Sequence, residues 1–491
     1  MPDAQAPPIS ASLDPIARSR FGVTEARRLL GRAAFGGTPD EIGGLVEMGP
    51  VAAVDHVLGF PVDPDDADAP ARPGVIREPT DAERRAARRA RSARDEEALA
   101  QIRTQRQAMQ RADRRQLAEL QAWWLTRMIS TAHPAREKLV LFWHGHFATS
   151  YRGQQNAYHL LLQNRLFRRL ALGPFDRLLR SVIRDPALLA YLNNNVSHRR
   201  KPNENLAREL LELFTLGEGN YTERDIKDGA RALTGYTFRG DEFVFREDWH
   251  DGDTKAILGV RGSLDGDGFV SAILRQRQCA RHIAQRLYRF YVADIAESFD
   301  EAPPWARPVI DGMADRIRRA RYDLRPALRD LFLSEHFYEP RLEGSRIKSP
   351  AELIVGAARS LGVRPERPAA LVRLMARMGQ HLFLPPSVAG WDGGRAWINT
   401  ATLVLRQNAA AFLMAREDVR RALPAARDAE AFSAALLARL LGPVADPQTP
   451  TGRRARAALD QFFSAHEGRL TRRSALGAAA LVTALPEFQQ C

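Results

Sequence analysis

The stretch from Lys201 to Gly217 constrains the fold most strongly, because it carries the signals that begin, continue and end a helix. Asn203 follows Pro202 and is a favoured N-cap residue, and Gly217 stands where helices commonly end. The apolar residues between them recur at helical spacing. They are Leu206, Leu210, Leu213 and Phe214. The pattern predicts an amphipathic helix that buries one face.

Charged residues crowd the same short helix. Glu209 and Glu212 are three residues apart and share a side, while Glu204 and Arg208 are four apart and can pair. One interpretation makes Glu209 and Arg208 catalytic residues. The other makes the charges structural, with Arg208 paired to Glu204 and Glu209 paired to a second arginine such as Arg231. The sequence leaves both interpretations open for Glu209.

Helix-start signals recur along the chain. Capping boxes stand at Thr38–Glu41, Thr80–Glu83 and Ser349–Glu352. We therefore expect a mainly α, multi-helical globular body. Residues 236–268 differ, because aromatic residues and Asp-Gly turns replace the helical pattern there, and we expect a small β-containing insertion.

We expect three parts along the chain: a disordered arm at residues 1–20, a helical core at residues 21–440, and C-terminal helices at residues 441–491 that pack on the core. Within the core, residues 80–116 form an Arg-rich helical insertion. It opens a run with almost no Gly or Pro that continues to about residue 132, so we expect one long helix there.

The chain of 491 residues has a formal net charge of +13, which favours anionic partners. In the Arg-rich insertion, however, Asp95, Glu96 and Glu97 interrupt the basic residues, and aromatic residues for base stacking are absent. A solvated helix laced with salt bridges is the favoured interpretation. Nucleic-acid binding through this helix is the weakest functional hypothesis.

The cysteines, the N-terminus and the apolar stretches indicate the disulfide content and the compartment. The two cysteines, Cys279 and Cys491, predict neither a disulfide framework nor a cysteine zinc site. The N-terminus lacks the apolar core of a secretory signal, and the longest apolar stretch, Ala475–Leu485, is too short to span a membrane. We expect a cytoplasmic protein without a membrane span, with export together with a partner as the alternative.

His144 and His146 flank a single glycine and are the first candidate metal ligands. In a strand or loop this spacing places both imidazoles on one side, whereas in a helix they diverge by about 200°. Gly145 indicates a helix end, where either geometry occurs. Together with Glu209, the pair makes a set suited to a divalent metal such as Zn, Mn or Fe. The alternative is one histidine packed in the core and the other at the surface.

Two further segments carry candidate functional residues. His250, Asp251 and Lys255 can supply a general base, a ligand and a substrate-binding cation. Asx-turns are the structural alternative for the aspartates of this segment. The Gly-rich loop from Ser387 to Asn399 can hold a sugar or another ringed ligand, or can be a structural loop. Its candidate substrate-binding residues are Trp391, Arg395, Trp397 and Asn399.

Several stretches together resemble the bacterial family called domain of unknown function 1800. They are Leu30–Gly36 with Thr38-Pro39, Arg136–Lys138, Phe142–Phe147, Pro202–Glu209, Glu212–Gly217, Tyr221–Glu223, Ala230–Gly235, His250-Asp251 with Lys255 and Leu258-Gly259, Val388–Trp391, Trp397–Asn399 and Leu485–Gln489. The resemblance covers nearly the whole chain. It implies a mainly helical fold and no established activity. It also implies a partner, because such proteins are often encoded beside members of domain of unknown function 1501, which resemble alkaline phosphatase and sulfatase relatives.

Three functions follow as hypotheses. The first is a metal-dependent enzyme, a hydrolase acting on an anionic or sugar-like substrate. The second is a non-catalytic binding or scaffold protein for a hydrolase-like partner of the domain of unknown function 1501 family. The third is nucleic-acid binding through the Arg-rich helix. No P-loop, nucleophile elbow or dinucleotide-binding fingerprint is present in the sequence.

Overall fold

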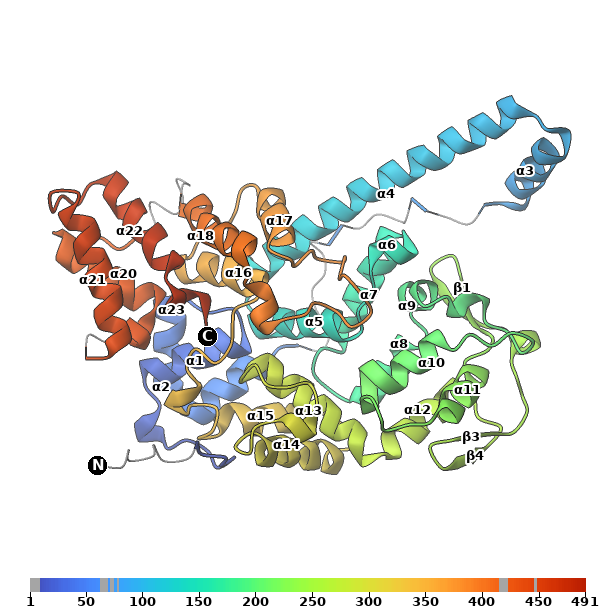
Figure 1. Cartoon of the computed structure of the whole chain (residues 1–491), viewed down its shortest axis with the longest axis horizontal. Helices are drawn as coiled ribbons and strands as arrows, with labels where there is room; N and C mark the ends of the chain where they lie inside the picture. Colours follow the sequence, from blue (N-terminus) through green and yellow to red (C-terminus); the bar gives the residue numbers. More distant parts are fainter. Residues whose placement is uncertain (1–8, 62–68, 71–74, 77–78, 415–422, 446–447) are drawn as a thin grey trace.

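A computed structural model describes residues 9–61, 69–70, 75–76, 79–414, 423–445 and 448–491. Over these residues the chain is mainly helical, with two small two-stranded antiparallel sheets. The predicted fold class is therefore confirmed. The C-terminal helices lie at one end of the molecule and the β-containing insertion at the other (Figure 1).

Helices precede and follow the β-containing insertion along the chain. The first half contains α1 (Val23–Ala33), α2 (Pro39–Leu58), α3 (Asp81–Ala93), α4 (Glu96–Ser130), α5 (Pro134–His146), α6 (Tyr151–Gln154), α7 (Ala157–Arg169), α8 (Phe175–Val182), α9 (Pro186–Tyr191), α10 (Asn205–Glu209) and α11 (Glu223–Ala232). The insertion contains β1 (Tyr236–Arg239), β2 (Glu242–Phe245), β3 (Lys255–Ile257) and β4 (Val260–Gly262). The second half contains α12 (Gly266–Arg275), α13 (Arg277–Tyr291), α14 (Arg307–Arg319), α15 (Arg325–Leu333), α16 (Pro350–Leu361), α17 (Pro368–Arg377), α18 (Thr400–Met414), α20 (Ala429–Leu440), α21 (Pro450–Ser464), α22 (Arg472–Ala484) and α23 (Pro486–Gln489).

The three predicted capping boxes are present at the starts of α2, α3 and α16. In each, the side chain of Thr38, Thr80 or Ser349 accepts a hydrogen bond from the backbone N–H three residues later, at 3.2 Å. The glutamate at that position reaches back to the backbone N–H of the capping residue. Because these bonds satisfy donors that no helix turn can satisfy, the local sequence determines where these helices begin.

The centre of the core is α5, which is buried along almost its whole length and packs against α4 and α7. Its buried residues include the charged Arg136, Glu137 and Lys138 beside the apolar ones. Glu137 receives a bidentate pair from Arg168, at 2.7 and 2.9 Å, and a bond from Arg127 at 3.2 Å. Lys138 pairs with Glu352 of α16 at 2.5 Å. These two networks fix α5 to its neighbours, since a buried charge is tolerated only when it is paired.

The predicted helix at 203–216 begins as α10 and continues as a π-helix, Leu210–Leu216, which ends at Gly217 with φ 82°. A π-helix leaves its last carbonyl groups without the usual α-helical donors. Side chains of other elements take their place: His146 contacts the carbonyl oxygen of Phe214 at 3.0 Å, and His282 of α13 contacts that of Leu213 at 3.0 Å. The widened turn is therefore held by histidines from α5 and α13.

The Arg-rich insertion differs from the expected single helix. It is a hairpin in which α3 folds back against α4, with a left-handed residue at Arg94 (φ 50°) between them. Asp95 caps α4 by accepting from the N–H of Ala98 at 2.9 Å, and Glu96 and Glu97 fill its first turn. An N-cap residue followed by acidic residues is a helix-start signal, so the break was encoded in the residues that interrupt the basic run.

The predicted β insertion is confirmed as two hairpins, with Tyr236 opposite Phe245 in the first and Lys255 opposite Gly262 in the second. Of the expected disordered arm, residues 1–8 lie outside the described residues. Residues 9–20 are packed on the body, where Ile16 is buried and donates to the carbonyl oxygen of Leu333 at 2.8 Å. The C-terminal helices α21 and α22 contact α18 and α20. In the described part of the chain, no helix is long and apolar enough to cross a membrane.

Candidate functional site

His144 and His146 both lie in the last turn of α5, so their side chains diverge as a helix requires. The Nδ2 group of Asn164 donates to Nε2 of His144 at 3.0 Å, and the ring of His144 packs against Trp124. His146 contacts Phe214 as described above. Burial holds the pKa of both imidazoles well below the usual value, and both rings are therefore neutral at neutral pH.

The structure does not gather the predicted metal ligands. Over the described ranges, no group of three or more His, Cys, Asp or Glu side chains is arranged to hold a metal ion. His144 accepts a hydrogen bond from an amide, and His146 donates to the π-helix instead of facing Glu209. Both histidines are packed in the core, which differs from the alternative with one at the surface.

Glu209 lies where α10 passes into the π-helix, and it is half-buried. Arg208 pairs with Glu204 at 3.3 Å, as the sequence allows, and with Glu223 at 3.1 Å. In the part of the chain that the structure describes, the carboxylate of Glu209 has neither hydrogen bond nor ion pair. Burial, and then the neighbouring Glu212, raise its pKa, although Arg208 acts against them. Among the described residues, Glu209 therefore pairs with neither a histidine nor Arg231.

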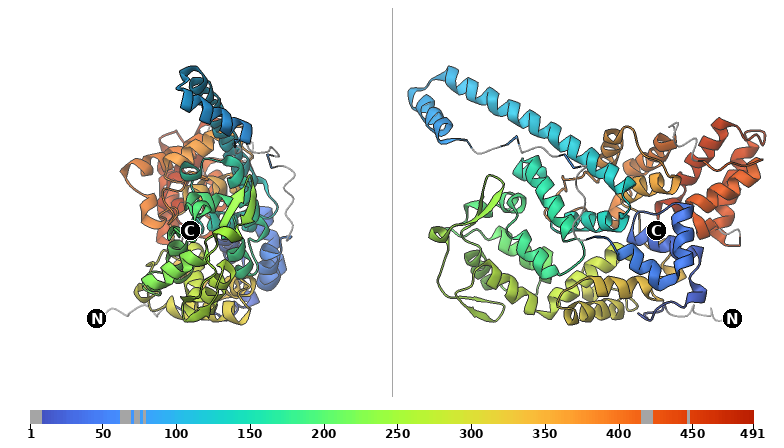
Figure 2. Two further views of the ribbon diagram at one scale, coloured as in Figure 1. Left: turned by 90° about the vertical axis from the view of Figure 1, so that its right-hand side faces the viewer. Right: turned by 180° about the vertical axis from the view of Figure 1, so that it is seen from behind.

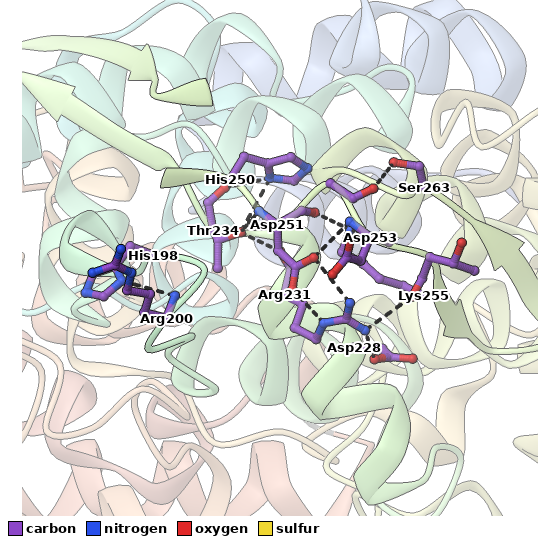
Figure 3. Close-up of polar contacts among 12 residues, drawn as sticks. His198, Arg200, Asp228, Arg231, Thr234, His250, Asp251, Asp253, Lys255 and Ser263 are labelled. Carbon is purple, nitrogen blue, oxygen red and sulfur yellow. Dashed lines mark hydrogen bonds and ion pairs between the residues drawn. The ribbon is translucent and has the colours of Figure 1, made fainter. Parts of the chain in front are cut away.

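Arg231 instead forms a clamp with Asp228 and Asp251 (Figure 3). Its Nε and Nη2 groups bind the carboxylate of Asp251 at 2.7 and 3.2 Å, and Nη1 binds Asp228 at 2.8 Å and the carbonyl oxygen of Thr254 at 3.3 Å. Burial alone would raise the pKa of Asp251, but the bonds from Arg231 hold it below the usual value. We call these three residues, with Lys255, the Arg231 clamp.

Backbone groups are hydrogen-bond partners of the predicted site residues in this segment, Lys255, His250 and Asp251. Lys255 is buried, and its ammonium group donates to the carbonyl oxygens of Asp251 at 2.5 Å and Asp253 at 3.0 Å. The Nδ1 group of His250 lies 2.9 Å from the carbonyl oxygen of Thr234. Asp251 accepts from the N–H of Asp253 at 3.0 Å, which is the Asx-turn of the structural interpretation. The Arg231 clamp therefore joins α11 to the second hairpin.

A different place in the molecule brings predicted ligand-binding residues together. Trp391, Arg395 and Trp397 line one cavity of about 640 Å³ between α5, α13 and the loop before α18. We call it the Trp391 cavity. Asn399 and Lys255 are not part of its lining; Asn399 instead caps α18, where its side chain accepts from the N–H of Thr402 at 2.9 Å.

Glycines allow the loop to lie directly on α5. Gly390 has φ 92°, and a Cβ atom there would lie 2.2 Å from the carbonyl oxygen of Gly145. A Cβ atom on Gly145 would in turn contact the indole of Trp391 at 3.6 Å. The close approach at Gly390 requires a residue without a side chain. It places Trp391 against the end of α5, next to the residues that the sequence singled out as a histidine pair.

The cavity wall contains four arginines and four carboxylates together with aromatic rings. The charged residues are Arg286, Arg289, Arg346, Arg395, Asp294, Glu297, Glu352 and Asp392. Some pair across the wall, as Arg289 does with Glu297 at 2.7 Å and Arg346 with Glu352 at 3.2 Å. Burial would raise the pKa of Glu352, but Arg346 and Lys138 hold it far below the usual value. Burial lowers the pKa of Arg286, which stands beside this acid–base row.

The sequence did not identify most of this wall. Glu352 appeared as a capping residue, and it does accept from the N–H of Ser349 at 2.8 Å, but its ion pairs come from α5 and from the segment before α16. One signal was available. Glu137 and Lys138 stand directly before the apolar run Leu139–Trp143 of α5, and a charged residue that is buried together with such a run requires a partner. Their partners are far away in sequence and could not be assigned.

A comparison with protein-family models matches residues 28–490 of the chain to the family described as "Protein of unknown function (DUF1800)". No curated protein and no solved structure matches the chain. The match includes α5, the π-helix, the Arg231 clamp and the Trp391 cavity, so these features lie within the family domain and not beside it. Because the match covers almost the whole length, the chain belongs to the domain of unknown function 1800 family.

Proposed function

We propose that the protein binds a sugar-like ligand, rich in hydroxyl groups, in the Trp391 cavity. The observation that carries the proposal is the composition of the wall, where two tryptophans stand among four arginines and four carboxylates. Aromatic faces pack against the apolar side of a sugar ring, and charged side chains bind its hydroxyl groups as donors and acceptors. The volume of about 640 Å³ is that of a small-molecule site.

The charge balance of the cavity wall favours a sugar-like substrate over a strongly anionic one. A site for a strongly anionic substrate has excess positive charge, whereas here the arginines and carboxylates of the lining are equal in number. Donors and acceptors in equal supply suit a neutral ligand with many hydroxyl groups, or one that carries a single carboxylate. The sugar-like substrate is therefore the form of the prediction that we retain.

Hydrolysis of such a ligand would need carboxylates that are free to exchange a proton. Asp294 and Asp392 are the lining acids without an ion pair in the described part of the chain, and Asp294 only accepts from the N–H of Ile347 at 3.1 Å. We assign them, in place of the dispersed His250, Asp251 and Glu209, as the acids of a hydrolytic reaction. Glycosidases use two such carboxyl groups at the scissile bond.

Binding to the full-length protein tests the proposal. Isothermal titration calorimetry with cellobiose, chitobiose, maltose and glucuronic acid would measure affinity, and Trp391→Ala would remove the central aromatic face. We expect at least one of these sugars to bind and Trp391→Ala to weaken it at least about tenfold. Trp305→Ala is the matched control, because Trp305 is half-buried against His336 and does not line the cavity.

Two results would overturn the proposal: no binding of any sugar in this panel at millimolar concentration, or equal affinities for wild type and Trp391→Ala. If binding is confirmed, loss of sugar release in Asp392→Asn with unchanged affinity would support the hydrolase assignment. Retained turnover in both Asp392→Asn and Asp294→Asn would remove it. The complex with a partner of the domain of unknown function 1501 family stays a prediction.

A further inference from the structure

The α3–α4 hairpin projects from the body, and α3 lies at its outer end (Figures 1 and 2). The root of α4 packs against α7, α16 and α17, but α3 packs against α4. Each helix of a two-helix hairpin buries only the part of its apolar face that meets the other helix. Most residues of α3 are exposed among the described residues, over a length of about 20 Å for its 13 residues.

The open side forms a groove of about 470 Å³ between α3 and α4. Its floor is apolar and includes Ala87, Ile102 and Met109, which are only partly buried by the hairpin itself. Arg88, Arg91 and Arg106 lie along its rim. Ile76 and Pro79 of the segment before α3 also line the groove. The groove therefore combines an apolar strip with flanking positive charge.

The rim arginines are available to a partner. Arg88, Arg91 and Arg106 are exposed, and their side chains form no ion pair or hydrogen bond with the described residues. This differs from Arg103 on the same hairpin, which pairs with Glu96 at 3.4 Å. Residues 81–116 contain eleven arginines against six carboxylates, so the hairpin as a whole is positively charged.

We propose that this groove binds an acidic amphipathic helix of a partner protein. An apolar stripe on that helix would cover Ile102 and Met109, and its flanking carboxylates would meet Arg88, Arg91 and Arg106. A third helix would complete a three-helix bundle and bury the seam that the hairpin leaves open. Charge complementarity would add association rate and selectivity to the apolar contact.

Other occupants fit the observations less well. Nucleic acid would gain from aromatic side chains, which are absent from residues 79–122, and its phosphates would be repelled by Asp95, Glu96 and Glu97 at the tip. The same groove of a second copy would bring two sets of unpaired arginines together, which costs free energy. Nucleic acid and a second copy are therefore outcomes that the test must separate.

Fluorescence anisotropy with the full-length protein provides the test. The probe is a labelled synthetic helix of about five turns, with leucine at helical spacing on one face and glutamate elsewhere. Comparison probes are a scrambled peptide of the same composition, a peptide with lysine in place of glutamate, and single-stranded and duplex DNA of equal charge. We expect saturable binding of the first peptide alone.

Two double variants with equal charge change locate the site. Arg88→Glu/Arg91→Glu alters the groove, whereas Arg85→Glu/Arg89→Glu alters α3 away from it. We expect the first to weaken peptide binding at least about tenfold and the second by less than about twofold. Circular dichroism checks helix content, and Arg88→Gln/Arg91→Gln replaces the first variant if the hairpin unfolds.

Equal weakening by both double variants would show nonspecific attraction to positive charge and would overturn the proposal. Binding of the scrambled peptide with the same affinity would do so as well, as would DNA that binds more tightly than the acidic helix. Dimerisation in light scattering that Arg88→Glu/Arg91→Glu abolishes would assign the groove to a second copy instead. None of these readouts depends on the Trp391 cavity.

Discussion

The Arg231 clamp and the Trp391 cavity are built from the same residue types but use them differently. In the clamp, the guanidinium of Arg231 is shared by two carboxylates and a carbonyl oxygen, and the ammonium of Lys255 is held by two backbone carbonyls. In the cavity wall, Arg395 and Asp392 have no such partners among the described residues, and a volume of about 640 Å³ lies next to them.

The difference shows why charged residues alone are weak evidence for a site. A polar group that is already satisfied stabilises the fold, and using it for a ligand would cost the bond it makes. A polar group beside a cavity can bind a ligand without that cost. Removing a clamp residue should therefore reduce stability, whereas removing a cavity residue should reduce binding. Four predictions test this division, ordered by the expected change in the free energy of unfolding.

The largest effect is expected from Arg168→Ala, in the buried ion-pair network around Glu137. Glu137 and Arg168 are almost completely buried, and Arg168 supplies two of the bonds to that carboxylate. Removing it leaves a charge in the core with too few donors, and we expect a loss of about 3–5 kcal/mol. Urea unfolding followed by circular dichroism measures it. The double variant Glu137→Leu/Arg168→Met removes both charges and should recover part of the loss, since Arg127 and Trp124 then lose their bonds to Glu137; a double variant less stable than Arg168→Ala would contradict the expectation.

The second effect depends on pH and concerns the histidines that hold the π-helix. Burial, and then Arg286, lower the pKa of His282 from 6.5 to about 4. Between these values the unfolded chain binds a proton and the folded chain does not, so stability is complete above about pH 6.5 and is lost as the pH falls towards 4. The loss amounts to at most about 3 kcal/mol.

In His282→Gln, an amide can still donate to the carbonyl oxygen of Leu213 but cannot titrate. We expect the free energy of unfolding of the variant to fall less steeply between about pH 6.5 and 4 than that of wild type, as measured by urea titrations at several pH values. His146 remains in the variant and keeps its own share of the slope. An unchanged slope would mean that His282 does not stay neutral in the folded protein.

The third effect is expected from Arg231→Ala in the clamp. Its side chain is partly exposed, and the carboxylates it leaves can reach water, so we expect a loss of about 1–3 kcal/mol. Sugar binding in the Trp391 cavity should stay within about twofold of wild type. Thermal unfolding and calorimetry measure the two quantities on one preparation. A fall in sugar affinity without a fall in stability would show that the Arg231 clamp serves ligand binding and not the stability of the fold.

The sequence predicted what is local. Capping boxes, the β-containing insertion and the pair of Arg208 with Glu204 depend on residues close to one another in the sequence, and they are present. The pairing of Lys138 with Glu352 joins residues 214 positions apart, and no spacing rule specifies it. The sequence did not predict the π-helix for a similar reason, because its carbonyl oxygens accept hydrogen bonds from His146 and His282, which lie on other elements.

The smallest effect concerns Glu209 and Glu212. Glu212 accepts from the hydroxyl of Tyr221 at 2.7 Å, so Glu212→Leu, which removes this acceptor, should cost about 1 kcal/mol. Glu209 has no such bond, and burial and Glu212 raise its pKa, which means that its charged form is destabilised in the folded protein. Glu209→Gln should therefore increase the free energy of unfolding at neutral pH, by less than about 1 kcal/mol. Chemical unfolding of the two variants, three residues apart on one helix, should give shifts of opposite sign.

A loss of stability in both variants would show that Glu209 is held by an interaction of its own, as the residues of the Arg231 clamp are. A gain in Glu209→Gln, accompanied by a loss of sugar binding or turnover, would mark it as a residue kept for function at a cost in stability.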